Sequence, residues 1–114
     1  MLKILHTVSS VLLTALGVVH TALTPVFYGR LTLGALWFAG AGLAMIFVGF
    51  LNLTFSHSTS RDRLTRILCY AANLLVVVFG SLTVVLDREP QVIFGLVLIV
   101  LMTTTAFMLR RSNH

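Results

Sequence analysis

Charged residues are scarce in this chain. Only 10% of its 114 residues are Asp, Glu, Lys or Arg, and just three of them are acidic. Cysteine occurs once, at Cys69, which excludes an intramolecular disulfide and a CxxC redox pair. No charged residue lies in the middle of a long apolar run. The buried charge that usually marks an ion pathway in a membrane protein is therefore missing.

Long apolar runs make up most of the chain. The chain is 58% hydrophobic and its mean hydropathy is +1.03, well outside the range of soluble domains. Four runs, at residues 4–23, 31–53, 67–86 and 91–109, are each long enough to cross a hydrocarbon core about 30 Å thick. None alternates like a barrel strand, so helices are the expected spanning elements. We expect an all-α membrane protein, an up-down bundle of four transmembrane helices forming one domain over residues 1–114.

Short polar segments separate the four runs. Pro25 should end the first helix, because proline has no N–H and disfavours helical geometry in the residue before it, and residues 28–30 should then turn the chain. Asp87, Glu89 and Pro90 fit the start of the last helix, where acidic groups face the positive end of the helix dipole.

The distribution of Lys and Arg predicts the orientation. Six of these residues fall on the side that holds both termini, and only Arg30 and Arg88 fall on the other; the six are Lys3, Arg61, Arg63, Arg66, Arg110 and Arg111. By the positive-inside rule, both termini should be cytoplasmic in a multi-pass protein of the cell membrane. The same bias accounts for most of the net charge of +5, so we expect no nucleic-acid partner.

Polar residues form stripes on the first and third predicted helices. At 100° per residue these stripes should face protein, because a polar group in lipid lacks hydrogen-bond partners. We expect His20 and Asn73 to point inward, whereas Leu12, Val19 and Leu75 should lie nearer the outside. The candidate polar interior site therefore consists of His20, Ser10, Thr24, Asn73 and Thr83.

Two spacings bear on how the helices pack. Ala35, Gly42 and Gly49 recur every seven residues, a small-residue seam that allows close helix crossing. A shift of 63 residues also places His6 over Cys69 and Ser10 over Asn73. The second pattern would indicate a parallel repeat of two hairpins, although chance explains so few matches more readily than duplication.

The histidines invite a test for cofactors. The separation of His6 and His20, about 21 Å along one helix face, resembles the haem-carrying helices of dihaem b-type cytochromes. The third helix offers Cys69 and Thr83 at the matching heights, so only a homodimer could supply the second axial ligands. The histidines also lack the three- or four-residue spacing of a metal site and share no depth with a carboxylate. We expect no cofactor, no metal site and no catalytic residue, and hence no enzyme.

Two small four-span families are similar to this chain in size. Small multidrug-resistance transporters couple protons through a glutamate in their first helix, which this chain lacks. Dual-topology fluoride channels resemble it in length, and Asn52 and Phe79 could be compared with their pore residues. The strong charge bias argues against insertion in both directions.

Three function classes remain after these exclusions. The first is a structural or accessory membrane subunit, surrounded by the lipid bilayer and packing against a second copy or a larger membrane protein. The second is a binder or carrier of an apolar small molecule, a quinone or a lipid, held between the first and third helices. The third is an oligomeric transporter in which His20 responds to protons. The absence of charged residues within the spans favours the first class.

Overall fold

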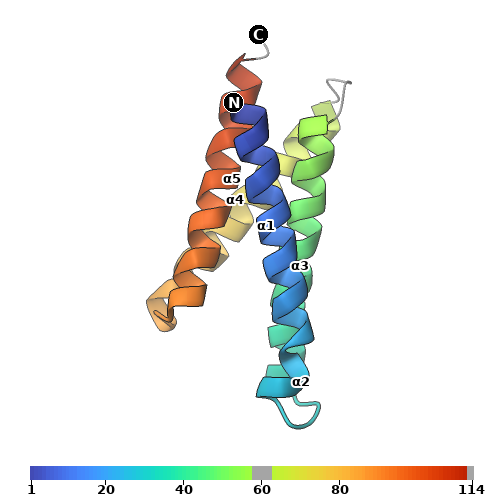
Figure 1. The fold of residues 1–114 in the computed structure, drawn as a ribbon, viewed down its shortest axis with the longest axis vertical. Coiled ribbons are helices and arrows are strands. Elements are labelled where there is room, and N and C mark those ends of the chain that lie inside the picture. Colours follow the sequence, from blue (N-terminus) through green and yellow to red (C-terminus); the bar gives the residue numbers. More distant parts are fainter. Residues whose placement is uncertain (58–62, 113–114) are drawn as a thin grey trace.

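The computed structural model describes residues 1–57 and 63–112 of the chain (Figure 1). This part of the chain is helical and contains no strand. Its elements are α1 (Leu2–Ala22), α2 (Thr24–Phe27), α3 (Leu33–His57), α4 (Arg63–Leu86) and α5 (Pro90–Ser112). The four long helices are each apolar and long enough to cross a membrane. The expected all-α bundle is confirmed at this level.

The helix boundaries differ from the predicted runs at the first turn. The chain does not leave helical geometry at Thr24 but forms the single-turn helix α2, with Pro25 in its first turn. Proline is tolerated there because the first N–H groups of a helix have no intrahelical partner. Asp87 and Glu89 precede α5 as expected, and the amide of Glu89 donates to the Asp87 carboxylate at 3.2 Å.

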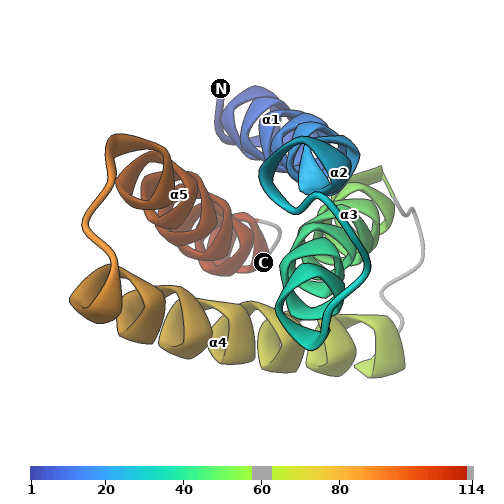
Figure 2. The ribbon, with the colours of Figure 1, turned by 90° about the horizontal axis from the view of Figure 1, so that it is seen from below.

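The helices form a ring in the order α1, α3, α4, α5 (Figure 2). Helix α3 packs antiparallel along the length of α1, and α5 lies beside α1. Helix α4 crosses behind the other helices at a steep tilt and packs against α5 and α3 but not against α1. The start of α1 and the end of α5 lie at the same end of the molecule (Figure 1). We call this the terminal end and the opposite one the hairpin end.

Glycines let α1 and α3 approach closely. A Cβ atom on Gly17 would lie 2.6 Å from the carbonyl oxygen of Gly42, and one on Gly49 would lie 3.0 Å from that of Ser10. Ala35, Gly42 and Gly49 are all buried, as the seven-residue spacing predicted. The hydroxyl of Thr21 also reaches across this seam to the carbonyl of Ala39, at 3.5 Å.

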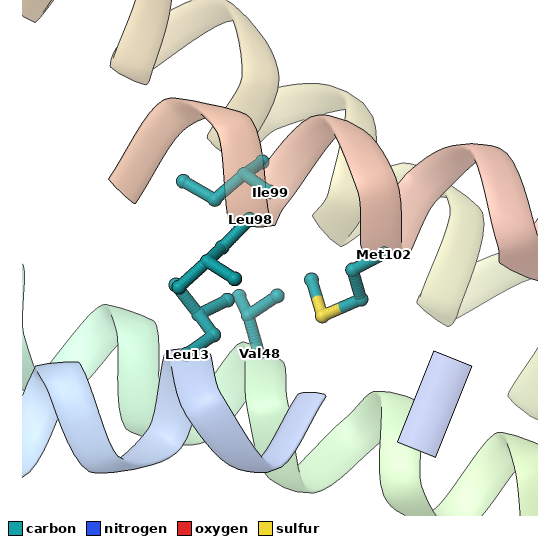
Figure 3. Close-up of a cluster of buried hydrophobic side chains, with 5 residues drawn as sticks. All are labelled: Leu13, Val48, Leu98, Ile99 and Met102. Atoms are coloured by element: carbon teal, nitrogen blue, oxygen red, sulfur yellow. The ribbon is translucent and has the colours of Figure 1, made fainter. Parts of the chain in front are cut away.

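A cluster of buried apolar side chains forms the core between the helices (Figure 3). Three helices supply its buried side chains, which are Leu13 of α1, Val48 of α3, and Leu98, Ile99 and Met102 of α5. Helix α4 adds only partly buried side chains to this core, among them Val76 and Val77. Large apolar side chains elsewhere are exposed, as is expected for helices that contact lipid.

Replacing Gly42 by alanine should destabilise the fold by about 1–3 kcal/mol. The new methyl group would meet two backbone atoms of α1, the carbonyl oxygen of Gly17 at 2.9 Å and the amide nitrogen of Thr21 at 3.0 Å. Gly40→Ala is the matched control in the same helix, because a Cβ atom there has no neighbour within 4 Å. Thermal unfolding in detergent measures both variants. Equal stability of the two would contradict the tight α1–α3 seam.

Candidate functional site

Four fully buried polar side chains meet near the terminal end of the bundle. His6 comes from α1, Asn52 from α3, and Cys69 and Asn73 from α4, and each has 0% of its surface exposed. His6 is near the start of α1 and Asn52 near the end of the antiparallel α3, so the two side chains lie at similar depth. Cys69 and Asn73 are one helical turn apart and share a face of α4. We call these four residues the polar cluster.

The two asparagines hold the polar cluster together. The Nδ2 group of Asn52 donates to Oδ1 of Asn73 at 2.7 Å, and Nδ2 of Asn73 donates back to Oδ1 of Asn52 at 2.9 Å. Asn52 also donates to the carbonyl of Val48, one turn earlier in its own helix, at 2.8 Å. Both hydrogens of the Asn52 amide are therefore used. This reciprocal pair links α3 to α4.

His6 and Cys69 converge on the same oxygen atom. Nε2 of His6 lies 3.1 Å from Oδ1 of Asn52, and the Cys69 thiol donates to that oxygen at 3.3 Å. The bond to the Val48 carbonyl fixes which end of the Asn52 amide is oxygen, because only the NH₂ group can donate there. His6 must then donate through Nε2–H, and in a neutral imidazole ring Nδ1 carries no proton. No described residue bonds to that Nδ1.

Serine and threonine hydroxyls near the polar cluster bond to their own helices. Ser10 is fully buried and donates to the carbonyl of His6 at 2.8 Å, and Thr14 donates in turn to the carbonyl of Ser10 at 2.8 Å. Such bonds satisfy a hydroxyl within one helix and leave it unavailable for linking helices. Ser10 therefore borders the polar cluster without bonding to the asparagines.

His20 lies in a separate, aromatic environment toward the hairpin end. Its ring stacks on Phe38, with centroids 3.8 Å apart and planes inclined by 18°. The rings of Phe27 and Tyr28 also contact that of Phe38, with centroid separations of 5.7 and 5.6 Å. Nε2 of His20 is buried and has no hydrogen-bond partner among the described residues. The hydroxyl of Thr24 donates to the carbonyl of His20 at 3.5 Å.

The structure divides the five residues of the candidate polar interior site among three places. Ser10 and Asn73 lie at the polar cluster, whereas His20 lies about 15 Å further along α1, a distance set by ten residues of helical rise, and Thr24 follows at the start of α2. Thr83 lies on α4 and donates to the carbonyl of Phe79 in the same helix at 2.9 Å. His20 is partly buried. The three residues expected to face outward, Leu12, Val19 and Leu75, are exposed by 44, 52 and 69%.

The contact among His6, Asn52 and Cys69 was not predicted from the sequence. A signal was present, since the 63-residue shift paired His6 with Cys69 and Ser10 with Asn73, and all four of these residues are fully buried. No spacing in the sequence indicates Asn73 as the partner of Asn52. Their bond joins residues 21 positions apart on different helices.

Metal-binding side chains do not gather into a cluster within the described residues. No group of three or more His, Cys, Asp or Glu residues is placed to hold a metal ion in that part of the chain. Comparison with known proteins adds no assignment, because no family model, curated protein or solved structure matches the chain.

The Asn52–Asn73 bond should appear as a coupling energy in a double-mutant cycle. Asn52→Ala and Asn73→Ala should each lower the free energy of unfolding. The double variant should lose less stability than the sum of the two single losses, by about 0.6–1.7 kcal/mol, which are the average and the largest coupling found for side-chain bonds between membrane helices. Equilibrium unfolding in detergent measures all four proteins. The pair of Asn73→Ala and Ser81→Ala is the control, because exposed Ser81 bonds only to its own helix. Additive losses for Asn52 and Asn73 would contradict the reciprocal pair.

Proposed function

We propose that this chain is a small multi-pass membrane protein that acts as a structural or accessory subunit. The observation that carries the proposal is the bonding of the polar cluster to itself. In the polar cluster the side chains of His6, Asn52, Cys69 and Asn73 bond to one another. The bonded atoms hold helices together and are not available to a substrate, and Nδ1 of His6 is the ring nitrogen of the cluster without a partner among the described residues.

The outer surface supports the same proposal. Helix α4 buries only Cys69 and Asn73, and its other face presents large apolar side chains such as Leu75 and Phe79, exposed by 69 and 62%. Helix α3 presents Trp37 and Phe47 in the same way. A helix with this much uncovered apolar surface can pack against lipid, a second copy or a larger membrane protein without any change in the cluster.

A second candidate function rests on the surroundings of His20. A buried imidazole nitrogen without a partner, beside a stacked aromatic ring, could bond to the polar end of an apolar ligand such as a quinone. The oligomeric transporter is a third candidate, in which His20 would be the proton-responsive group. Both alternatives depend on His20, and the structural proposal does not.

Removing the His20 imidazole separates these functions. The protein is purified from its membrane in mild detergent, weighed by native mass spectrometry, and reconstituted into liposomes carrying a pH gradient. A structural subunit should give an assembly heavier than the 12.5 kDa chain, with no quinone and no flux above that of empty liposomes. His57→Gln is the control for His20→Gln, since His57 is exposed. A quinone or a proton flux that His20→Gln alone removes would contradict the structural role.

We further propose that both termini face the cytoplasm, because six of the eight Lys and Arg residues fall on the predicted side of the membrane that holds both termini. Arg61 lies outside the described residues. In a Cys69→Ala background, Lys3→Cys should react with a membrane-impermeant maleimide only after the cells are opened. Arg88→Cys should react in intact cells, because Arg88 and Lys3 are both exposed, at opposite ends of the bundle. The reverse pattern would contradict the orientation.

A further inference from the structure

A shallow pocket lies at the rim of the terminal end. It is formed where the start of α1 meets the end of α3, and its lining residues are Lys3, Ile4, Thr7, Val8 and His57. Its volume is about 270 Å³, just below the range of pockets that enclose a drug-sized molecule. The pocket is open to the outside. It therefore suits one end of a longer molecule.

The upper wall of this rim pocket is cationic. Lys3 is exposed and forms no ion pair with any described residue. Nδ1–H of His57 donates to the carbonyl of Leu53 at 3.1 Å and lies 3.0 Å from the hydroxyl of Ser56, so Lys3 is the group of this wall that an anion would meet. The described acidic residues, Asp87 and Glu89, lie at the hairpin end. An anion would meet no acidic competitor among the described residues of this rim.

The lower wall is apolar and continues into the membrane-spanning part of α1. Ile4 and Val8 are exposed by 66 and 47%, and Leu12, one turn further, by 44%. Residues four apart lie on one helix face, so these three side chains form a row about 12 Å long below Lys3. From the terminal end inward, a cation is followed by a row of apolar side chains. This order matches that of the phosphate group and the acyl chain of a phospholipid.

We infer that the rim pocket binds an anionic phospholipid, with its phosphate at Lys3 and one acyl chain along Ile4, Val8 and Leu12. The inference rests on the proposed cytoplasmic position of the termini, since anionic lipids give the cytoplasmic leaflet its negative surface potential. A zwitterionic lipid fills the same row of apolar side chains, but its headgroup adds a positive charge beside Lys3.

Native mass spectrometry with defined lipids tests the site. The purified protein is titrated with phosphatidylglycerol and with phosphatidylcholine of the same acyl chains. Phosphatidylglycerol should bind more tightly, and Lys3→Gln should weaken it by about fivefold, the effect of removing one cation near an anionic lipid surface. Arg63→Gln is the matched control, because Arg63 is exposed at the same end and does not line the pocket. The affinity of the Arg63→Gln variant for phosphatidylglycerol should stay within about twofold of that of the parent protein.

Two further measurements distinguish a built site from diffuse charge. Val8→Trp fills the pocket without changing the charge, so it should also weaken phosphatidylglycerol binding, whereas millimolar inorganic phosphate should not displace the lipid. Unchanged binding in Lys3→Gln, or an equal loss in Arg63→Gln, would overturn the inference. Displacement by phosphate would show an anion site rather than a lipid site. Detergent-solubilised protein has no leaflets, so these results are independent of the labelling test of orientation.

Discussion

The reciprocal amide pair of Asn52 and Asn73 is the interaction on which the arrangement of α4 depends. A polar side chain within a membrane-spanning helix needs a hydrogen-bond partner, because hydrocarbon offers none. Helix α4 buries only two side chains, Cys69 and Asn73, and both bond to Asn52 of α3. His6 of α1 bonds to the same Asn52 oxygen atom. One carbonyl group thus joins three helices near the terminal end, while toward the hairpin end α4 packs against α5.

The rest of the bundle is held mainly by close packing, with the bond from Thr21 to the Ala39 carbonyl added across the α1–α3 seam. Glycines bring the backbones of α1 and α3 into contact, and the apolar core joins this pair to α5 through Leu13, Val48 and Met102. Close packing of this kind gives one rigid pair of helices, whereas α4 has few buried contacts to fix its tilt. The contrast explains why the polar residues collect where α4 crosses α3. It also supports a role in which α4 presents its uncovered face to neighbours in the membrane.

The sequence predicted the parts of the fold that depend on local composition and spacing. Four apolar runs gave the four long helices, and the seven-residue recurrence of Ala35, Gly42 and Gly49 gave the buried seam. Helix α2 was missed because Pro25 is compatible both with a helix end and with a first turn. The polar cluster was missed for another reason. His6 and Asn52 are 46 residues apart, and their contact depends on how far antiparallel helices slide past one another, which no single-helix period determines.

The position of the proton on the His6 ring reports whether three helices meet at Oδ1 of Asn52. The account requires the His6 ring to donate through Nε2–H to Asn52, with Nδ1 unprotonated. Nitrogen-15 NMR of histidine-labelled protein in micelles, with the signals assigned by the loss of one set in His6→Gln, reports the tautomer. We expect a neutral ring with its proton on Nε2, exchanging slowly with deuterated water because the side chain is fully buried. A proton on Nδ1, or rapid exchange, would contradict the shared oxygen that joins the three helices.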